Sequence, residues 1–164
     1  MKIGLLSDTH SYLDPQIFKH FEACDEIWHA GDIGNIELCD QLQAFKPLIA
    51  VYGNIDGQDI RLSHPEHQIF EREGFNIWMT HIGGYPPKYT SKIKLKLDEF
   101  KPDLFVCGHS HILKVISDPK RNLIHLNPGA CGKHGFHQVK TLLRFELNNK
   151  KISNMQVIEL GKRA

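Results

Sequence analysis

Hydrophobic residues in the first third of the chain alternate between short continuous runs and helically spaced positions. The runs cover residues 3–6, 27–30 and 48–52, and they predict strands that are buried on both faces. Between the runs, apolar residues recur at helical spacing across 17–21 and 38–45. The order strand, helix, strand, helix, strand predicts a parallel sheet with right-handed crossovers.

Later in the chain, strand-like segments come in pairs that flank short polar turns. Such pairs predict β-hairpins, because turn residues between two apolar segments reverse the direction of the chain. The predicted pairs are residues 67–72 with 75–80, residues 115–117 with 123–126, and residues 141–147 with 152–160. The second half of the fold is therefore expected to contain antiparallel pairs.

The segment 93–97 fits two patterns. Its strict alternation is typical of a strand, whereas the spacing of Ile93, Leu97 and Phe100 is typical of one face of a helix. A crossover is needed before the buried segment 104–107, which favours the helix. The elements together predict an α/β fold, a single domain of residues 1–164 with two facing mixed β-sheets flanked by helices in an αββα sandwich.

Composition narrows the class of protein. Hydrophobic residues make up 41% of the chain, and the formal net charge is +1. A near-neutral balance argues against a dedicated nucleic-acid or membrane-surface binder. No apolar run approaches the ~20 residues of a membrane helix, and the 4 cysteines lack the spacing of a zinc ribbon or a redox dithiol. We expect a cytoplasmic protein with reduced cysteines and no membrane partner, and a homo-oligomer remains open.

Polar motifs made of Asp, Asn or His directly follow five of the predicted strands. In order, they are Asp8-Thr9-His10, Gly31-Asp32, Gly53-Asn54, His81 and Gly108-His109-Ser110-His111. Because ligands bind beyond the carboxyl ends of strands in open α/β sheets, we expect these side chains to meet. Imidazole with carboxylate favours Mn, Ni, Fe or Zn over Mg or Ca. Two such ions ~3.5–4 Å apart clamp a phosphate ester and generate its nucleophile.

The ordered set of motifs resembles the calcineurin-like metallophosphoesterases. Gly53-Asn54-Ile55-Asp56 and the late Asn127-Pro128-Gly129-Ala130 resemble the small bacterial and archaeal phosphodiesterase branch, which includes the retromer scaffold subunit. The resemblance implies hydrolysis of a phosphodiester in a small substrate by a hydroxide that two divalent transition-metal ions activate.

The resemblance also assigns roles to individual residues. It implies a first metal held by Asp8, His10, Asp32 and His111, and a second metal held by Asp32, Asn54, His81 and His109. Asp32 would bridge the two ions. Asn54 would also face the phosphate, and Asp32, Asn54 and His109 would be catalytic.

Ile55 is a departure from the larger relatives, which have a His there that helps to protonate the leaving group. Isoleucine cannot transfer a proton, so the site should suit diesters or leaving groups that are easily expelled. Asp56 is the nearest candidate acid, although a role in orienting the loop or a ligand is the stronger interpretation.

Other interpretations stay open at this point. A non-catalytic metal-binding scaffold or interaction module on the same fold would predict loss of histidine ligands, and none is missing here. A nuclease is disfavoured by the near-neutral charge. For Lys133, His134 and His137 a solvated loop is favoured over contact with substrate.

Overall fold

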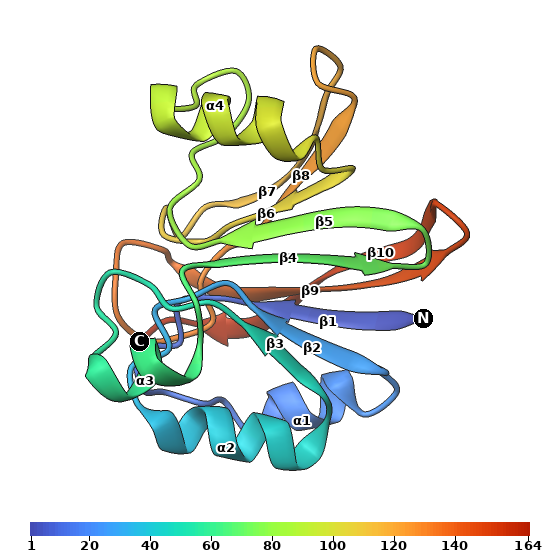
Figure 1. The fold of residues 1–164 in the computed structure, drawn as a ribbon. Coiled ribbons are helices and arrows are strands. Elements are labelled where there is room, and N and C mark those ends of the chain that lie inside the picture. Colours follow the sequence, from blue (N-terminus) through green and yellow to red (C-terminus); the bar gives the residue numbers. More distant parts are fainter.

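Two five-stranded β-sheets lie face to face in the computed structural model, which describes all 164 residues (Figure 1). The first sheet contains β1 (Lys2–Leu6), β2 (Glu26–His29), β3 (Leu48–Ala50), β9 (Val139–Asn148) and β10 (Lys151–Lys162), in the order β10-β9-β1-β2-β3. The second contains β4 (His67–Arg72), β5 (Phe75–Thr80), β6 (Leu104–Val106), β7 (Leu113–Asp118) and β8 (Leu123–Pro128), in the order β4-β5-β6-β8-β7. All three predicted hairpins are present as antiparallel pairs.

Helices cover the outer face of each sheet. They are α1 (Gln16–Phe21), α2 (Ile36–Phe45), α3 (Gln58–Ser63) and α4 (Ser91–Phe100). The first two cover the first sheet and α4 covers the second, so the predicted αββα sandwich is confirmed (Figure 1). None of the helices is long and apolar enough to cross a lipid bilayer.

The ambiguous segment 93–97 lies in α4. The Thr90 hydroxyl accepts a hydrogen bond from the Ile93 N–H and caps the first turn of the helix. Ile93 and Leu97 are buried against the second sheet, whereas Leu95 between them is exposed. Burial at a spacing of four residues therefore decides in favour of the helix over the alternating strand.

The continuous apolar runs arise because each central strand faces two separate cores. Leu5 and Trp28 lie in the core between the two sheets, whereas their neighbours Leu6 and Ile27 pack beneath α1 and α2. Since successive strand residues point to opposite faces, a strand covered on both sides needs apolar residues at nearly every position.

The topology gathers one end of many strands at one edge of the sandwich. β1 pairs in parallel with β2, and β2 with β3. In the second sheet, β5, β6 and β8 also run parallel to one another. Their carboxyl ends lie at the left of Figure 1, and the predicted polar motifs follow five of these six strands.

A buried ion pair ties the loop after β1 to the first sheet. The Lys140 ammonium on β9 donates to Asp14 Oδ2 at 2.6 Å, and the Tyr12 hydroxyl donates to the same oxygen at 3.4 Å. Burial alone would raise the pKa of Asp14, but the hydrogen bond and charge of Lys140 outweigh it and lower that pKa. The carboxylate therefore stays ionised at neutral pH.

Replacing Lys140 with methionine should destabilise the protein by roughly 3 kcal/mol at pH 7, because it leaves a buried carboxylate without its partner. The loss should shrink as the pH falls toward the ordinary carboxyl range, where the unpaired Asp14 becomes protonated. Denaturant unfolding followed by circular dichroism measures both effects. The double variant Lys140→Met/Asp14→Leu should recover most of the stability, and a double variant as unstable as the single one would contradict this account.

Candidate metal centre

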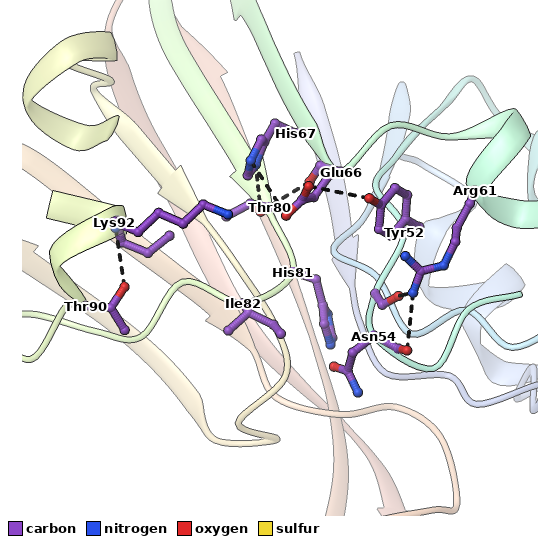
Figure 2. A pocket seen from close by; sticks show the side chains of 12 residues that line it. Tyr52, Asn54, Arg61, Glu66, His67, Thr80, His81, Ile82, Thr90 and Lys92 are labelled. Carbon is purple, nitrogen blue, oxygen red and sulfur yellow. Dashed lines mark hydrogen bonds and ion pairs between the residues drawn. The ribbon is translucent and has the colours of Figure 1, made fainter. Parts of the chain in front are cut away.

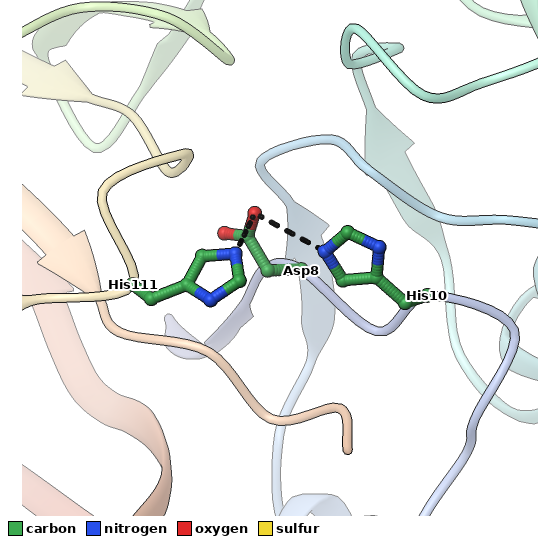
Figure 3. Close-up of side chains that lie close together, drawn as sticks. All are labelled: Asp8, His10 and His111. Carbon is green, nitrogen blue, oxygen red and sulfur yellow. Dashed lines mark ion pairs between the residues drawn. The ribbon is translucent and has the colours of Figure 1, made fainter. Parts of the chain in front are cut away.

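Three of the predicted ligands meet beyond the ends of β1 and β6. The ligand atoms of Asp8, His10 and His111 all lie within 4.8 Å of one another. Asp8 Oδ1 is 3.1 Å from His111 Nε2 and 3.9 Å from His10 Nε2, and both rings turn a nitrogen toward the carboxylate (Figure 3). The Asp8 side chain is completely buried, so its carboxylate can interact only with groups inside the protein.

A second group forms beside the first. The ligand atoms of Asp32, His81 and His109 also lie within 4.8 Å of one another, and Asp32 Oδ2 is 3.2 Å from His81 Nε2. Asn54 lines a cavity together with His81, and Figure 2 shows its side chain beside the His81 ring. The structure therefore brings together all seven side chains that the sequence singled out.

The two groups face each other closely enough to form one constellation. Asp32 Oδ2 is 3.8 Å from His10 Nε2, which belongs to the first group. Asp8 Oδ1 is 3.9 Å from His81 Nε2, which belongs to the second. One oxygen of each carboxylate thus faces both groups, which is the placement that a bridging ligand requires.

Each of the two carboxylates uses one oxygen for hydrogen bonds that fix its orientation and turns the other oxygen toward the histidines. Asp8 Oδ2 accepts hydrogen bonds from the Ser7 hydroxyl at 2.6 Å and from the His109 N–H at 3.1 Å. Asp32 Oδ1 accepts one from the Ile55 N–H at 3.0 Å. These hydrogen bonds hold the remaining oxygen of each carboxylate toward the histidines. The motifs alone do not reveal these contacts.

The hydrogen bonds of His81 leave a lone pair aimed at a carboxylate. Its Nδ1 lies 2.8 Å from the Ala30 carbonyl oxygen, which can only accept, so Nδ1 carries the proton. In the neutral ring, Nε2 then presents a lone pair to Asp32 Oδ2. Burial opposes a charge on His81, but its contacts with Asp32 and Asp8 outweigh burial and raise its pKa. A positive charge is therefore favoured between these atoms.

Three buried polar atoms at this place have no hydrogen-bond partner. They are Asp8 Oδ1, His10 Nε2 and His81 Nε2. Buried polar atoms are almost always satisfied, because leaving one unpaired costs roughly 1–3 kcal/mol. Carboxylate and imidazole atoms that converge without partners fit a divalent transition-metal ion, which would satisfy all three.

The backbone is strained at the same residues. Five predicted ligands have a positive φ, a conformation uncommon outside glycine: Asp8 (56°), His10 (47°), Asp32 (54°), His109 (66°) and His111 (56°). Such residues concentrate at functional sites, where the surrounding structure holds them in place. The positive φ values at five of the predicted ligands therefore fit a functional site at this place.

The loop that carries Asn54 is held by Asp56 and Arg61. The Asp56 carboxylate is buried and accepts the N–H groups of Gly34 and Gly53, one on each oxygen. The Arg61 guanidinium donates to the carbonyl oxygens of Gly53, Asn54 and Asp56. Both Asp56 oxygens are thus engaged in orienting the loop, which favours that role over proton donation.

Position 53 requires glycine because Asp32 lies too close to leave room for a side chain. A Cβ atom built on it would lie 2.0 Å from Asp32 Oδ1 and 2.3 Å from the Asp32 nitrogen. Any side chain there would displace the carboxylate that faces both groups of ligands. The Gly-Asn motif therefore combines a predicted ligand with the space that a second predicted ligand needs.

If the site hydrolyses the phosphodiesters that the sequence resemblance implies, replacing Asp56 with alanine should lower kcat by about 10- to 100-fold, because Asn54 and Asp32 lose the contacts that orient their loop. If Asp56 positions the loop, the loss will be equal for diesters with aryl and alkyl leaving groups. Steady-state kinetics on both substrates measures this. A variant that keeps full activity on the aryl diester and loses it only on the alkyl diester would identify Asp56 as the acid instead.

A cavity of ≈ 490 Å³ opens beside His81 and Asn54 (Figure 2). Most of its lining is polar, with the side chains of Tyr52, Arg61, Glu66, His67, Thr80, Thr90 and Lys92. The Tyr52 hydroxyl donates to Glu66 at 3.4 Å, and His67 Nδ1 lies 2.9 Å from the Thr80 hydroxyl. The cavity has the size of a small-molecule site and offers groups of both charges to a polar substituent.

Further residues lie behind the predicted ligands and support the loops that carry them. Asn127 donates from Nδ2 to the Gly108 carbonyl oxygen at 2.9 Å, next to His109. His29 Nε2 lies 2.9 Å from the Thr9 hydroxyl, and burial lowers the pKa of His29 to about 3, so the ring is neutral. Burial raises the pKa of the Cys131 thiol to about 12, so this thiol stays protonated and unreactive at neutral pH.

The chain is similar in sequence to known phosphoesterases. Residues 1–150 match the calcineurin-like phosphoesterase superfamily domain. A probable metallophosphoesterase of Methanocaldococcus jannaschii is 33% identical over 136 residues, covering 79% of this chain and 68% of that protein. A phosphodiesterase of the same organism is 26% identical over 148 residues, covering 80% of this chain and 84% of that protein.

Solved structures share the fold at lower identity. The structure of an archaeal phosphodiesterase superposes with a TM-score of 0.77 at 22% identity, covering 98% of this chain and 100% of that one. Zinc-bound Vps29 of Entamoeba histolytica superposes with a TM-score of 0.75 at 17% identity, covering 100% of both chains. With the match over residues 1–150, these findings show that the chain belongs to the calcineurin-like phosphoesterase superfamily.

Proposed function

We propose that residues 1–164 form a single metallophosphoesterase domain that hydrolyses phosphodiester bonds with two divalent transition-metal ions, with manganese as the working metal. The observation that carries the proposal is the convergence of two ligand groups whose buried atoms lack partners. Membership of the superfamily supports a metal-dependent phosphoesterase. The number of ions and the preference for diesters are the parts that need a test.

The constellation supports a definite assignment of ligands. The first ion would be held by Asp8, His10, Asp32 and His111, and the second by Asp32, Asn54, His81 and His109. When bound, the ions would supply the positive charge that clamps a phosphate ester and lowers the pKa of water. Asp32 would belong to both sets of ligands, since its Oδ2 faces both His10 and His81.

The residues around the ions would bind and orient the ester. The Asn54 amide lies at the edge of the cavity and can donate to a phosphate oxygen. His109 is exposed, unlike His81, so its ring can be reached from solvent. The cavity beside them accepts a small polar group, which favours a small phosphoester over a polymer.

The two residues that follow Asn54 offer no free proton for the leaving group. Ile55 cannot supply a proton, and both oxygens of Asp56 are engaged with backbone N–H groups. Substrates whose leaving oxygen has a low pKa need no such donor. We therefore expect activated aryl phosphodiesters to be hydrolysed faster than alkyl ones.

The direct test is hydrolysis of bis(p-nitrophenyl) phosphate and p-nitrophenyl phosphate by protein loaded with Mn²⁺ or Ni²⁺. We expect turnover of the diester at a higher kcat/KM than of the monoester. A purified protein that binds two metal ions and turns over neither ester would contradict the proposed activity.

A non-catalytic scaffold on the same fold is the second candidate. It is favoured by the similarity in fold to Vps29 and opposed by the complete set of seven ligands. It predicts no turnover with either ester and a stable partner that co-purifies with the protein. The kinetic test above decides between the two functions.

A further inference from the structure

His137 lies behind His111 on the loop 131–138, where the ligand assignment gives it no role. The two Nδ1 atoms are 3.3 Å apart, and the ring centroids are 5.2 Å apart at an interplanar angle of 72°. On its other side, His137 Nε2 lies 2.9 Å from the Gly132 carbonyl oxygen. Both nitrogens of His137 are therefore engaged inside the protein, and neither is left for a substrate.

These contacts determine which nitrogen of each ring carries hydrogen. The Gly132 carbonyl can only accept, so Nε2 of His137 donates and Nδ1 of the neutral ring is an acceptor. The hydrogen between the two Nδ1 atoms must then come from His111. His111 is left with a bare lone pair on Nε2, the atom that lies 3.1 Å from Asp8 Oδ1 (Figure 3).

We propose that His137 is a positioning residue that selects the tautomer of His111 able to bind a metal ion through Nε2. The inference rests on the proposed function, because that function makes His111 a ligand. The Ala30 carbonyl does the same for His81 by accepting from its Nδ1. Hydrogen bonds of this kind fix the orientation and tautomer of metal-binding histidines in general.

The loop is built so that His137 is held at this position. A Cβ atom on Gly135 would lie 2.1 Å from His111 Nδ1, so the loop packs directly on the ring. The Gly132 N–H donates to the Asp8 carbonyl oxygen at 3.0 Å. Arg163 near the C-terminus donates to the carbonyl oxygens of His137 at 3.0 Å and Lys133 at 3.2 Å.

The same loop contains a matched control. His134 is exposed and has no hydrogen bond, although its ring centroid lies 5.2 Å from that of His10. Replacing His134 with glutamine therefore changes an imidazole on this loop without touching the contact to His111. His137→Gln keeps one acceptor and one donor, whereas His137→Leu removes both.

Calorimetric titration with Mn²⁺ tests the inference without reference to activity. We expect His137→Leu to weaken one of the two Mn²⁺ sites by about 10- to 100-fold while the other site is unchanged. His137→Gln should recover most of that affinity, and His134→Gln should match the wild type. Two unchanged sites in His137→Leu would overturn the inference.

The tautomer can be observed directly in the unmodified protein. Imidazole ¹⁵N NMR of the Zn²⁺-loaded wild type should show His111 protonated at Nδ1 and His137 protonated at Nε2. His137 protonated at Nδ1 instead would overturn the inference even if His137→Leu failed to fold. A protein that binds both ions and shows these tautomers but hydrolyses no ester would contradict the proposed function alone.

Discussion

Replacing Asp32 with asparagine is expected to reduce phosphodiester hydrolysis by at least about a thousandfold, because Asp32 is the carboxylate that we assign to both metal ions. That factor corresponds to a loss of ~4 kcal/mol in transition-state stabilisation. Asp32 Oδ2 is the oxygen that faces His10 and His81, and the change removes its charge while keeping its shape. Steady-state kinetics with bis(p-nitrophenyl) phosphate at saturating Mn²⁺ measures the loss.

The fold should survive this substitution. The asparagine carbonyl can still accept the Ile55 N–H, which the aspartate accepts on Oδ1. Asp40→Asn is a matched control, since Asp40 is exposed on α2 and makes no side-chain hydrogen bond or ion pair. We expect the control to keep wild-type activity and both proteins to give the wild-type circular dichroism spectrum. Residual activity of Asp32→Asn above a tenth of wild type would contradict the bridging role.

Removing metal should abolish activity and lower thermal stability together. His81 Nε2 and Asp32 Oδ2 lie 3.2 Å apart and Asp8 Oδ1 is buried without a hydrogen-bond partner, so a bound cation would stabilise the folded protein. An ion present at 100 times its dissociation constant adds about 2.7 kcal/mol per site to the free energy of unfolding. Protein dialysed against a chelator should therefore melt several degrees lower and regain both properties when Mn²⁺ is added.

The control for this experiment is the same chelator already saturated with Mn²⁺. It should leave activity and melting temperature unchanged, because it has no capacity left to remove an ion from the protein. A protein that contains less than a tenth of a metal ion per chain and still hydrolyses the diester at the wild-type rate would contradict the account.

Much of the fold could be predicted because the buried strands leave strong patterns. β1 and β2 are covered on both faces, so they appear as apolar runs, and the turns mark each hairpin. The short helix α3 could not be predicted. It has six residues and buries only Ile60, so it lacks the second apolar position that would reveal a helical period.

The sequence was sufficient to predict that the site residues lie close together, because the order of strands and helices indicates parallel strands. Parallel strands place their carboxyl ends at one edge, so a motif after each strand identifies a shared site. The orientation of each ligand could not be predicted, because it depends on partners far away in the sequence. His109 supplies its N–H to Asp8, and Ala30 supplies its carbonyl to His81.

The contact between His137 and His111 could not be predicted from the residues that surround His137 in the sequence. Polar residues after a glycine-containing turn are typical of a solvated loop, and Lys133 and His134 are indeed exposed. His137 differs because Gly135 lets the loop approach His111 and because Arg163 holds the loop there. Neither contact leaves a periodic signal in the chain.

The measurement that tests the central claim most directly is anomalous diffraction from crystals grown with Mn²⁺. The account predicts two anomalous peaks per chain, one among Asp8, His10 and His111 and one among Asp32, His81 and His109, with Asp32 in contact with both. A single peak, or two peaks away from these residues, would contradict a dinuclear centre.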